Sequence, residues 1–131
     1  MTREDYDRYV RAFNERDYDA VFDFYVEYPE IAFFGIEIRS REQLRAFYGF
    51  LHQYVRETVT VERFAGSAEL AAVEAVVRVE GLRDLSAETL AANDMPGLMP
   101  IRAGEVQDMR QWIHYPLRDG RFTSVSCVLV P

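Results

Sequence analysis

The sequence predicts an α+β domain in which helices from the first part of the chain pack on one face of a curved antiparallel sheet. Apolar residues recur at helical spacing up to about residue 55 and alternate with polar residues after it. The pair Asp119-Gly120 separates the last two apolar segments, and this pair is typical of a two-residue hairpin turn. The chain has the length of one domain, so we expect residues 1–131 to form a single unit.

Two helices are expected before residue 29. Thr2 and Asp5 have the spacing of a capping box, so the first helix should begin there and end near residues 14–16. Asp17 is a favourable N-cap for a second helix, and Pro29 blocks its continuation. The apolar stripes of these helices are Tyr6, Tyr9, Val10 and Phe13, and then Tyr18, Val21, Phe22 and Tyr25.

One strand and one more helix complete the first half of the chain. Residues 31–38 are rich in β-branched and aromatic side chains and predict a strand with a bend at Gly35. Ser40 and Gln43 form a second capping box at the start of a third helix. The stripe of this helix is Leu44, Phe47, Tyr48, Leu51 and Val55.

Four strands are expected in the second half, over residues 58–64, 70–82, 105–117 and 122–130. In the second of these strands Val73 and Val77 should share one face, with Glu74 and Arg78 on the other. The connection over residues 83–104 contains prolines and glycines, with one short helix expected at 86–92. A connection of this length is often a lid or rim of a functional site.

The composition excludes several classes of function. All 15 basic residues are arginine, so no lysine is present to form a Schiff base or a phosphate-binding P-loop. The net charge of -7 argues against binding to nucleic acid or to an anionic membrane surface. No apolar segment has the length of a membrane helix, and the first ten residues lack the apolar core of a signal peptide. With a single cysteine, Cys127, and no metal-ligand spacing, we expect a cytoplasmic protein without metal or cofactor.

Three segments resemble one known family. The segment Arg8-Tyr9-Val10-x-Ala12-Phe13-Asn14-x-x-Asp17-Tyr18-Asp19-Ala20, followed by Phe24-Tyr25, resembles the first two helices of the NTF2-like superfamily. Within it the closest likeness is to SnoaL-like proteins, which are relatives of ketosteroid isomerases. Arg41-Glu42-x-Leu44-x-x-Phe47-Tyr48 is similar to their third helix, and Asp119-Gly120-Arg121-Phe122 to their final hairpin. The resemblance implies an NTF2-like cone, in which three helices and a curved sheet enclose a pocket. It also implies a small apolar ligand and a homodimer through the outer sheet face.

The resemblance also implies roles for individual residues. The isomerase relatives use an Asp base, with a Tyr and a protonated Asp that stabilise an oxyanion. The donor tyrosine corresponds to Tyr9, and Tyr48 corresponds to a tyrosine behind it. The base falls on Ala32 or Phe33 and the second Asp on Trp112, so both carboxylates are missing. The chain should therefore not isomerise ketosteroids by that mechanism.

A two-residue turn at 119–120 would pair His114 with Val125, Trp112 with Cys127 and Arg110 with Leu129. The resemblance implies that this face of the sheet, with Arg110, Trp112 and His114, points into the pocket. His114 then becomes the candidate acid or base, and Tyr9 the hydrogen-bond donor to a carbonyl. The candidate substrate-binding residues are Trp112, Tyr48, Phe33, His52, Arg110 and Met99.

Each of these residues also has a structural interpretation. A single His in a strand and a Tyr on an amphipathic helix are more often packing residues than catalysts. Arg110 has Glu74 and Glu80 as candidate ion-pair partners, and His52 fits an exposed helix end as well as a pocket wall. The pattern places no carboxylate inside the cavity.

Two functions follow with similar weight. One is a SnoaL-like enzyme for proton-transfer chemistry, of the isomerase, dehydratase or cyclase type, on a small hydrophobic carbonyl or polyketide-like compound. The alternative is a non-catalytic module for small-ligand binding or dimerisation. A weaker third hypothesis is a subunit of a larger oxygenase.

Overall fold

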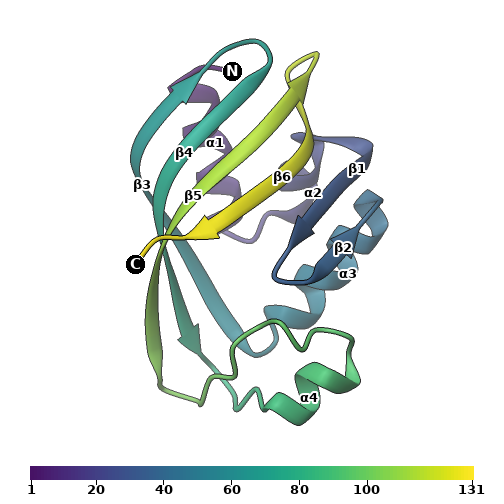
Figure 1. Cartoon of the computed structure of the whole chain (residues 1–131), viewed down its shortest axis with the longest axis vertical. Coiled ribbons are helices and arrows are strands. Elements are labelled where there is room, and N and C mark those ends of the chain that lie inside the picture. Colours follow the sequence, from purple (N-terminus) through teal and green to yellow (C-terminus); the bar gives the residue numbers. More distant parts are fainter.

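The computed structural model describes residues 1–131 and confirms the predicted α+β architecture (Figure 1). The helices are α1 (Arg3–Asn14), α2 (Tyr18–Asp23), α3 (Arg41–Leu51) and α4 (Ala87–Ala92). The strands are β1 (Tyr25–Phe33), β2 (Ile36–Ile38), β3 (Val55–Gly66), β4 (Leu70–Gly81), β5 (Val106–Arg118) and β6 (Arg121–Leu129). They form one sheet in the order β2-β1-β6-β5-β4-β3, in which only the β1–β6 pair is parallel. No helix is long and apolar enough to cross a membrane.

The predicted capping residues begin the helices. Thr2 accepts a hydrogen bond from the backbone N–H of Asp5, whose carboxylate accepts one from the backbone N–H of Thr2. Asp17, Ser40 and Ser86 each accept a hydrogen bond from the backbone N–H three residues on and so cap α2, α3 and α4. The return bond of the predicted Ser40–Gln43 capping box does not form, because the side chain of Gln43 accepts from the backbone N–H of Arg39 instead. These bonds satisfy backbone N–H groups that have no partner within the helix.

Two residues assigned to helical stripes belong to strands instead. Tyr25 begins β1 and pairs with Phe122 of β6, and Val55 begins β3 and pairs with Gly81 of β4. Both residues are buried at 2% exposure or less. Their spacing in sequence fits a helix, but pairing with a distant strand decides their conformation.

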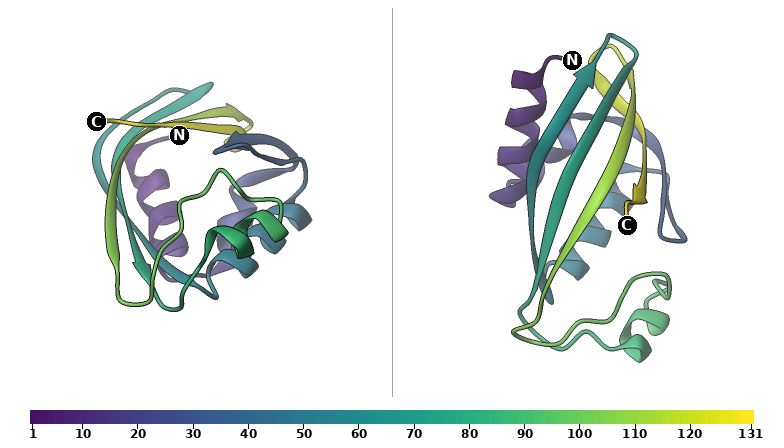
Figure 2. Two further views of the ribbon diagram at one scale, coloured as in Figure 1. Left: turned by 60° about the horizontal axis from the view of Figure 1, so that its bottom comes forward. Right: turned by 60° about the vertical axis from the view of Figure 1, so that its left-hand side comes forward.

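The sheet curls around the helices, so that its concave face and the helices enclose the interior (Figure 2). In β4 the residues Ala71, Val73, Ala75 and Val77 point inward and are buried, while Arg78 is exposed on the outer face. The predicted alternation in this strand is confirmed.

The last hairpin departs from the predicted register. Asp119 and Gly120 both have positive φ, at 52° and 78°, as a type I′ turn requires. Next to the turn Leu117 pairs with Phe122, but further on His114 pairs with Ser126, so β6 contains one extra residue. Pro116 lies opposite this bulge, and its missing N–H removes one bond of the ladder. A shift of one residue exchanges the two faces of one strand relative to its partner.

The connection between β4 and β5 lies across one end of the cone and carries α4 (Figure 2). A bridge between Leu85 and Ile101 closes it into a compact loop. Gly97 lies directly against the β1–β2 turn, where a Cβ atom would meet the carbonyl oxygen of Phe34 at 2.0 Å. Only glycine allows the loop to approach this turn so closely.

Candidate functional site

A cavity of about 210 Å³ lies between the concave face of the sheet, helices α1 and α3, and the loop that carries α4. Of its 28 lining residues, 24 are hydrophobic. The other four are Glu57, Gly97, Gln107 and Gln111. A dry cavity of roughly 150 Å³ is known to hold benzene, so this one suits an apolar ligand with one or two rings.

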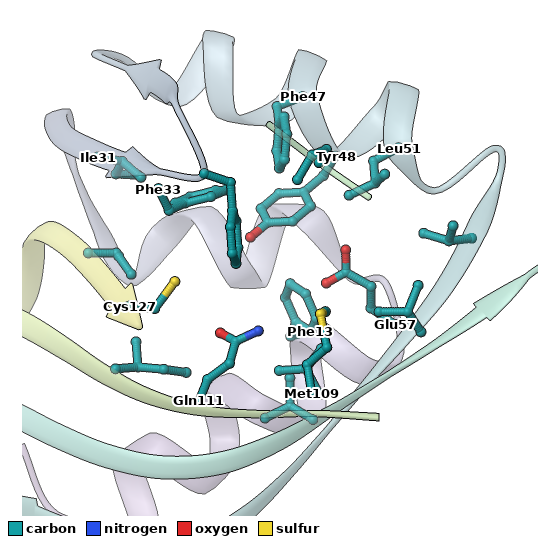
Figure 3. A pocket seen from close by; sticks show the side chains of 18 of the residues that line it. Phe13, Ile31, Phe33, Phe47, Tyr48, Leu51, Glu57, Met109, Gln111 and Cys127 are labelled. Atoms are coloured by element: carbon teal, nitrogen blue, oxygen red, sulfur yellow. The ribbon is translucent and has the colours of Figure 1, made fainter. Parts of the chain in front are cut away.

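Three polar side chains point into this apolar space (Figure 3). Tyr48 comes from α3, Glu57 from β3 and Gln111 from β5. None of the three side chains makes a hydrogen bond within the protein, although Gln111 is only 6% exposed. Because these polar atoms are accessible from the cavity and have no partner within the protein, they are suited to binding polar atoms of a ligand.

Four buried tyrosines are paired through their hydroxyl groups, and three of them, Tyr9, Tyr25 and Tyr115, line the cavity. The hydroxyl groups of Tyr9 and Tyr25 are hydrogen-bonded at 2.9 Å, and those of Tyr6 and Tyr115 at 2.8 Å. Burial raises the pKa of Tyr9 to about 12. Burial also raises the pKa values of Tyr25 and Tyr115 well above the ordinary value. These hydroxyl groups therefore stay protonated at neutral pH, and they are already paired with one another.

Tyr48 differs from these four because its hydroxyl group is free. Burial raises its pKa well above the ordinary value, and the nearby Tyr9 and Glu57 raise it further. Tyr48 thus remains a hydrogen-bond donor at any pH near neutrality. Because the ring points its hydroxyl into the cavity (Figure 3), Tyr48 is placed to donate to a ligand.

Glu57 is the only charged side chain that lines the cavity, and its side chain is 15% exposed. Its nearest basic neighbour is His52, with 3.7 Å between Nε2 of the ring and Oε1 of the carboxylate. His52 is itself buried at the C-cap of α3, and its Nδ1 lies 2.7 Å from the hydroxyl group of Tyr18.

The sulfur of Cys127 also faces the cavity (Figure 3). Burial raises its pKa, so the side chain is a neutral thiol at physiological pH. No group of three or more His, Cys, Asp or Glu side chains is arranged to hold a metal ion.

The candidate residues Tyr9, Tyr48, Phe33 and Met99 all line the cavity. His52 does not line it and lies behind Glu57 instead. The exposed helix end considered for His52 is excluded, since the residue is only 6% exposed.

The predicted inward orientation of His114, Trp112 and Arg110 is wrong. All three lie on the outer face of β5, where Trp112 is 51% exposed and Arg110 forms an ion pair with Glu62 at 3.0 Å. The cause is the extra residue in β6. Val125, Cys127 and Leu129 do face the cavity as expected, but the bulge pairs Cys127 with Ile113 and Leu129 with Gln111. Neither His114 nor Trp112 can therefore act on a ligand in this pocket.

Sequence reasoning missed Glu57 and Gln111. In β5 the buried residues Gln111, Ile113, Tyr115 and Leu117 alternate with exposed or half-buried ones, and this apolar alternation was the available signal. Glu57 was missed because the strand was expected to begin at residue 58, whereas β3 begins three residues earlier. The conclusion that no carboxylate lies inside the cavity is therefore corrected.

Structures of other proteins share this architecture. A SnoaL-like polyketide cyclase from Agrobacterium tumefaciens has a TM-score of 0.74 at 14% identity, over 99% of this chain and 93% of that one. An NTF2-like protein of unknown function from Burkholderia pseudomallei also gives 0.74, at 13% identity over 99% and 92%. A protein with a ketosteroid isomerase-like fold from Catenulispora acidiphila, solved in complex with trimethylamine, gives 0.72 at 12% identity over 98% and 86%. No curated protein sequence matches the chain.

The cone, the pocket and these neighbours define an NTF2-like fold. The family model of the SnoaL-like domain matches residues 6–125, and the chain belongs to that family.

Proposed function

We propose that this protein is an acid/base enzyme that removes a proton next to the carbonyl group of a small apolar compound. The observation that carries the proposal is the set of three unpaired polar groups, from Tyr48, Glu57 and Gln111, directed into one apolar cavity. A carboxylate is a suitable proton acceptor, and hydroxyl and amide N–H groups are suitable donors to a developing oxyanion.

In the proposed reaction, the Glu57 carboxylate takes the proton from the carbon next to the carbonyl. The electron pair of the broken C–H bond moves into the carbonyl group and gives an enolate. The hydroxyl group of Tyr48 and the side-chain amide of Gln111 donate hydrogen bonds to the enolate oxygen. Return of the proton to another carbon completes an isomerisation. Alternatively, the enolate carbon attacks a second carbonyl carbon in the same molecule and closes a ring. The π electrons of that carbonyl then move to its oxygen, and the resulting alkoxide takes back the proton from Glu57.

The remaining lining residues would shape the substrate. Tyr9 is paired with Tyr25, so we assign it to the wall and to support of the hydroxyl network rather than to the reaction. Phe33 and Met99 would contact the apolar body of the ligand, with Met99 at the rim, where it is 62% exposed. These residues hold no metal or cofactor in the proposed mechanism.

The test uses 3-cyclohexen-1-one, a one-ring ketone that isomerises to a conjugated enone with strong ultraviolet absorbance. Glu57→Gln should lower the rate by about 10²- to 10⁴-fold. Tyr48→Phe should lower it by about 10²- to 10³-fold. Glu62→Gln is the matched control, because Glu62 lies on the same strand and pairs with Arg110 on the outer face. Binding of the probe without any isomerisation would favour the non-catalytic alternative.

We also propose that two copies of the chain pair through the outer sheet face. Trp112 and Val128 are neighbours across β5 and β6 and are exposed by 51% and 57%, and Val106 on the same face is exposed by 51%. Light scattering should give twice the mass of one chain, and Trp112→Lys should give a monomer. A wild-type monomer at micromolar concentration would contradict this pairing.

The single cysteine agrees with the reducing cytoplasm in which we expect the protein to act.

A further inference from the structure

His52 contains the only fully buried side-chain nitrogen or oxygen atom in the protein that lacks a hydrogen-bond partner. The atom is Nε2, and the ring is 6% exposed. Buried polar atoms are almost always paired, so an exception beside a pocket calls for an explanation. The carboxylate that Nε2 faces is that of Glu57, with its Oε1 at 3.7 Å.

The imidazole ring is held from three sides. The rings of Tyr18 and Tyr48 stack on it, with centroids at 5.8 and 5.2 Å, and Phe13 contacts it edge-on at 5.9 Å. Below the ring, the guanidinium group of Arg16 donates hydrogen bonds to the backbone oxygens of His52 and Val55. The ring is therefore fixed in the direction that aims Nε2 at Glu57.

Tyr18, His52 and Glu57 come from three different elements and form one line from the surface to the cavity. Tyr18 of α2 is half-buried, His52 caps α3, and Glu57 of β3 lines the cavity. The titratable and charged groups around the ring are Tyr18, Tyr48, Glu57 and Arg16.

The chemistry of these neighbours selects one tautomer. A carboxylate only accepts hydrogen bonds, so a hydrogen on Nε2 has a partner in Glu57, whereas a lone pair there would face negative charge. With the hydrogen on Nε2, Nδ1 becomes the acceptor, and the hydroxyl group of Tyr18 donates to it at 2.7 Å.

We propose that His52, held in the Nε2–H tautomer by Tyr18, is a positioning residue that orients the carboxylate of Glu57 for proton abstraction. This inference rests on the proposed function of Glu57. The distance of 3.7 Å is longer than a hydrogen bond, so the contact must shorten for the Nε2–H group to hold the carboxylate during the reaction. A carboxylate without this partner would rotate among several orientations in the apolar pocket.

The first test compares two amides of different reach at position 52. The amide nitrogen of Gln occupies the place of Nε2, whereas the shorter Asn does not reach Glu57. His52→Gln should retain isomerisation of 3-cyclohexen-1-one within about threefold, while His52→Asn should lower kcat by about ten- to hundredfold with KM nearly unchanged. Equal kcat values for His52→Asn and wild type would overturn the proposal.

A third variant separates positioning from packing. His52→Leu removes the unpaired buried nitrogen and keeps apolar contacts with the neighbouring rings. It also removes the acceptor of the Tyr18 hydroxyl group, so we expect its unfolding temperature to stay close to that of the wild type while kcat falls as in His52→Asn. A lower unfolding temperature together with an unchanged kcat would show that the ring is structural.

The second test reads the tautomer directly and needs no substrate. The chain has two histidines, so nitrogen-15 labelling of histidine gives a spectrum of two rings, and His114→Gln assigns them. We expect His52 to be the Nε2–H tautomer, and Tyr18→Phe to convert part of it to the Nδ1–H form. An Nδ1–H tautomer in the wild type would refute the proposal. If the tautomer is as expected but the wild type does not isomerise the ketone, the proposed function fails and the geometry of His52 stands.

Discussion

Replacing Tyr9 by phenylalanine should destabilise the protein at pH 8 and stabilise it at pH 11.5. At pH 8 the substitution leaves the hydroxyl group of Tyr25 without its partner at 2.9 Å, which should cost about 1 kcal/mol of unfolding free energy. Tyr25, Tyr48 and Tyr115 are present in both proteins, so their own contributions largely cancel in the difference.

The pKa of Tyr9 decides whether the wild type gains or loses unfolding free energy at high pH. Burial raises this pKa from 10.0 to about 12 in the folded protein. Between these two values the unfolded chain has lost the proton and the folded protein still holds it, so stability falls as the pH rises. For a shift of this size the wild type loses about 2 kcal/mol by pH 11.5 through Tyr9 alone. The phenylalanine variant does not have this loss and should be the more stable protein at pH 11.5.

The assay is urea unfolding followed by circular dichroism at pH 8, 10 and 11.5. Tyr28→Phe is the control, since Tyr28 is 72% exposed and should give the same difference from wild type at every pH. A difference in unfolding free energy between wild type and Tyr9→Phe that stays constant from pH 8 to 11.5 would show that folding does not raise the pKa of Tyr9.

Three further predictions concern the loop, the thiol and the outer face. Gly97→Ala places a methyl group 2.0 Å from the carbonyl oxygen of Phe34, so it should lower the unfolding free energy by about 1–3 kcal/mol and weaken binding of 2-cyclohexen-1-one in a titration. Because burial raises its pKa, Cys127 should react slowly with iodoacetamide at pH 7.5, faster as the pH rises, and more slowly again when the ketone fills the cavity, as mass spectrometry would show. His114→Gln should leave the isomerisation rate within about twofold of wild type, in line with the small effects of surface substitutions; a larger loss would mean that the outer face takes part in the reaction.

The fold could be predicted from the sequence because its local signals agree with one another. Capping residues such as Thr2 and Ser40 and the turn at Asp119-Gly120 act within a few residues, and the structure has each of them at the expected place. Tyr25 and Val55 were misassigned because their helical spacing is overridden by pairing with distant strands.

The site was harder to predict because it depends on the register of one hairpin. A single extra residue in β6 decides whether Trp112 or Gln111 faces the cavity, and the turn alone does not reveal it. Pro116, near the end of β5, was the local signal for that bulge. Glu57 lies before the predicted start of the strand at residue 58. It becomes a candidate for the cavity only because β3 begins at Val55.

In the proposed reaction, Tyr48 and Gln111 donate hydrogen bonds to one carbonyl oxygen inside the apolar cavity. Infrared difference spectra of 2-cyclohexen-1-one labelled with carbon-13 at the carbonyl measure this polarisation in the bound ligand. We expect a stretching frequency below that of the ketone in hexane, which moves back toward the hexane value in Tyr48→Phe and in Gln111→Met. A bound ketone with the same frequency in the wild type and in both variants would show that neither side chain donates to the carbonyl oxygen.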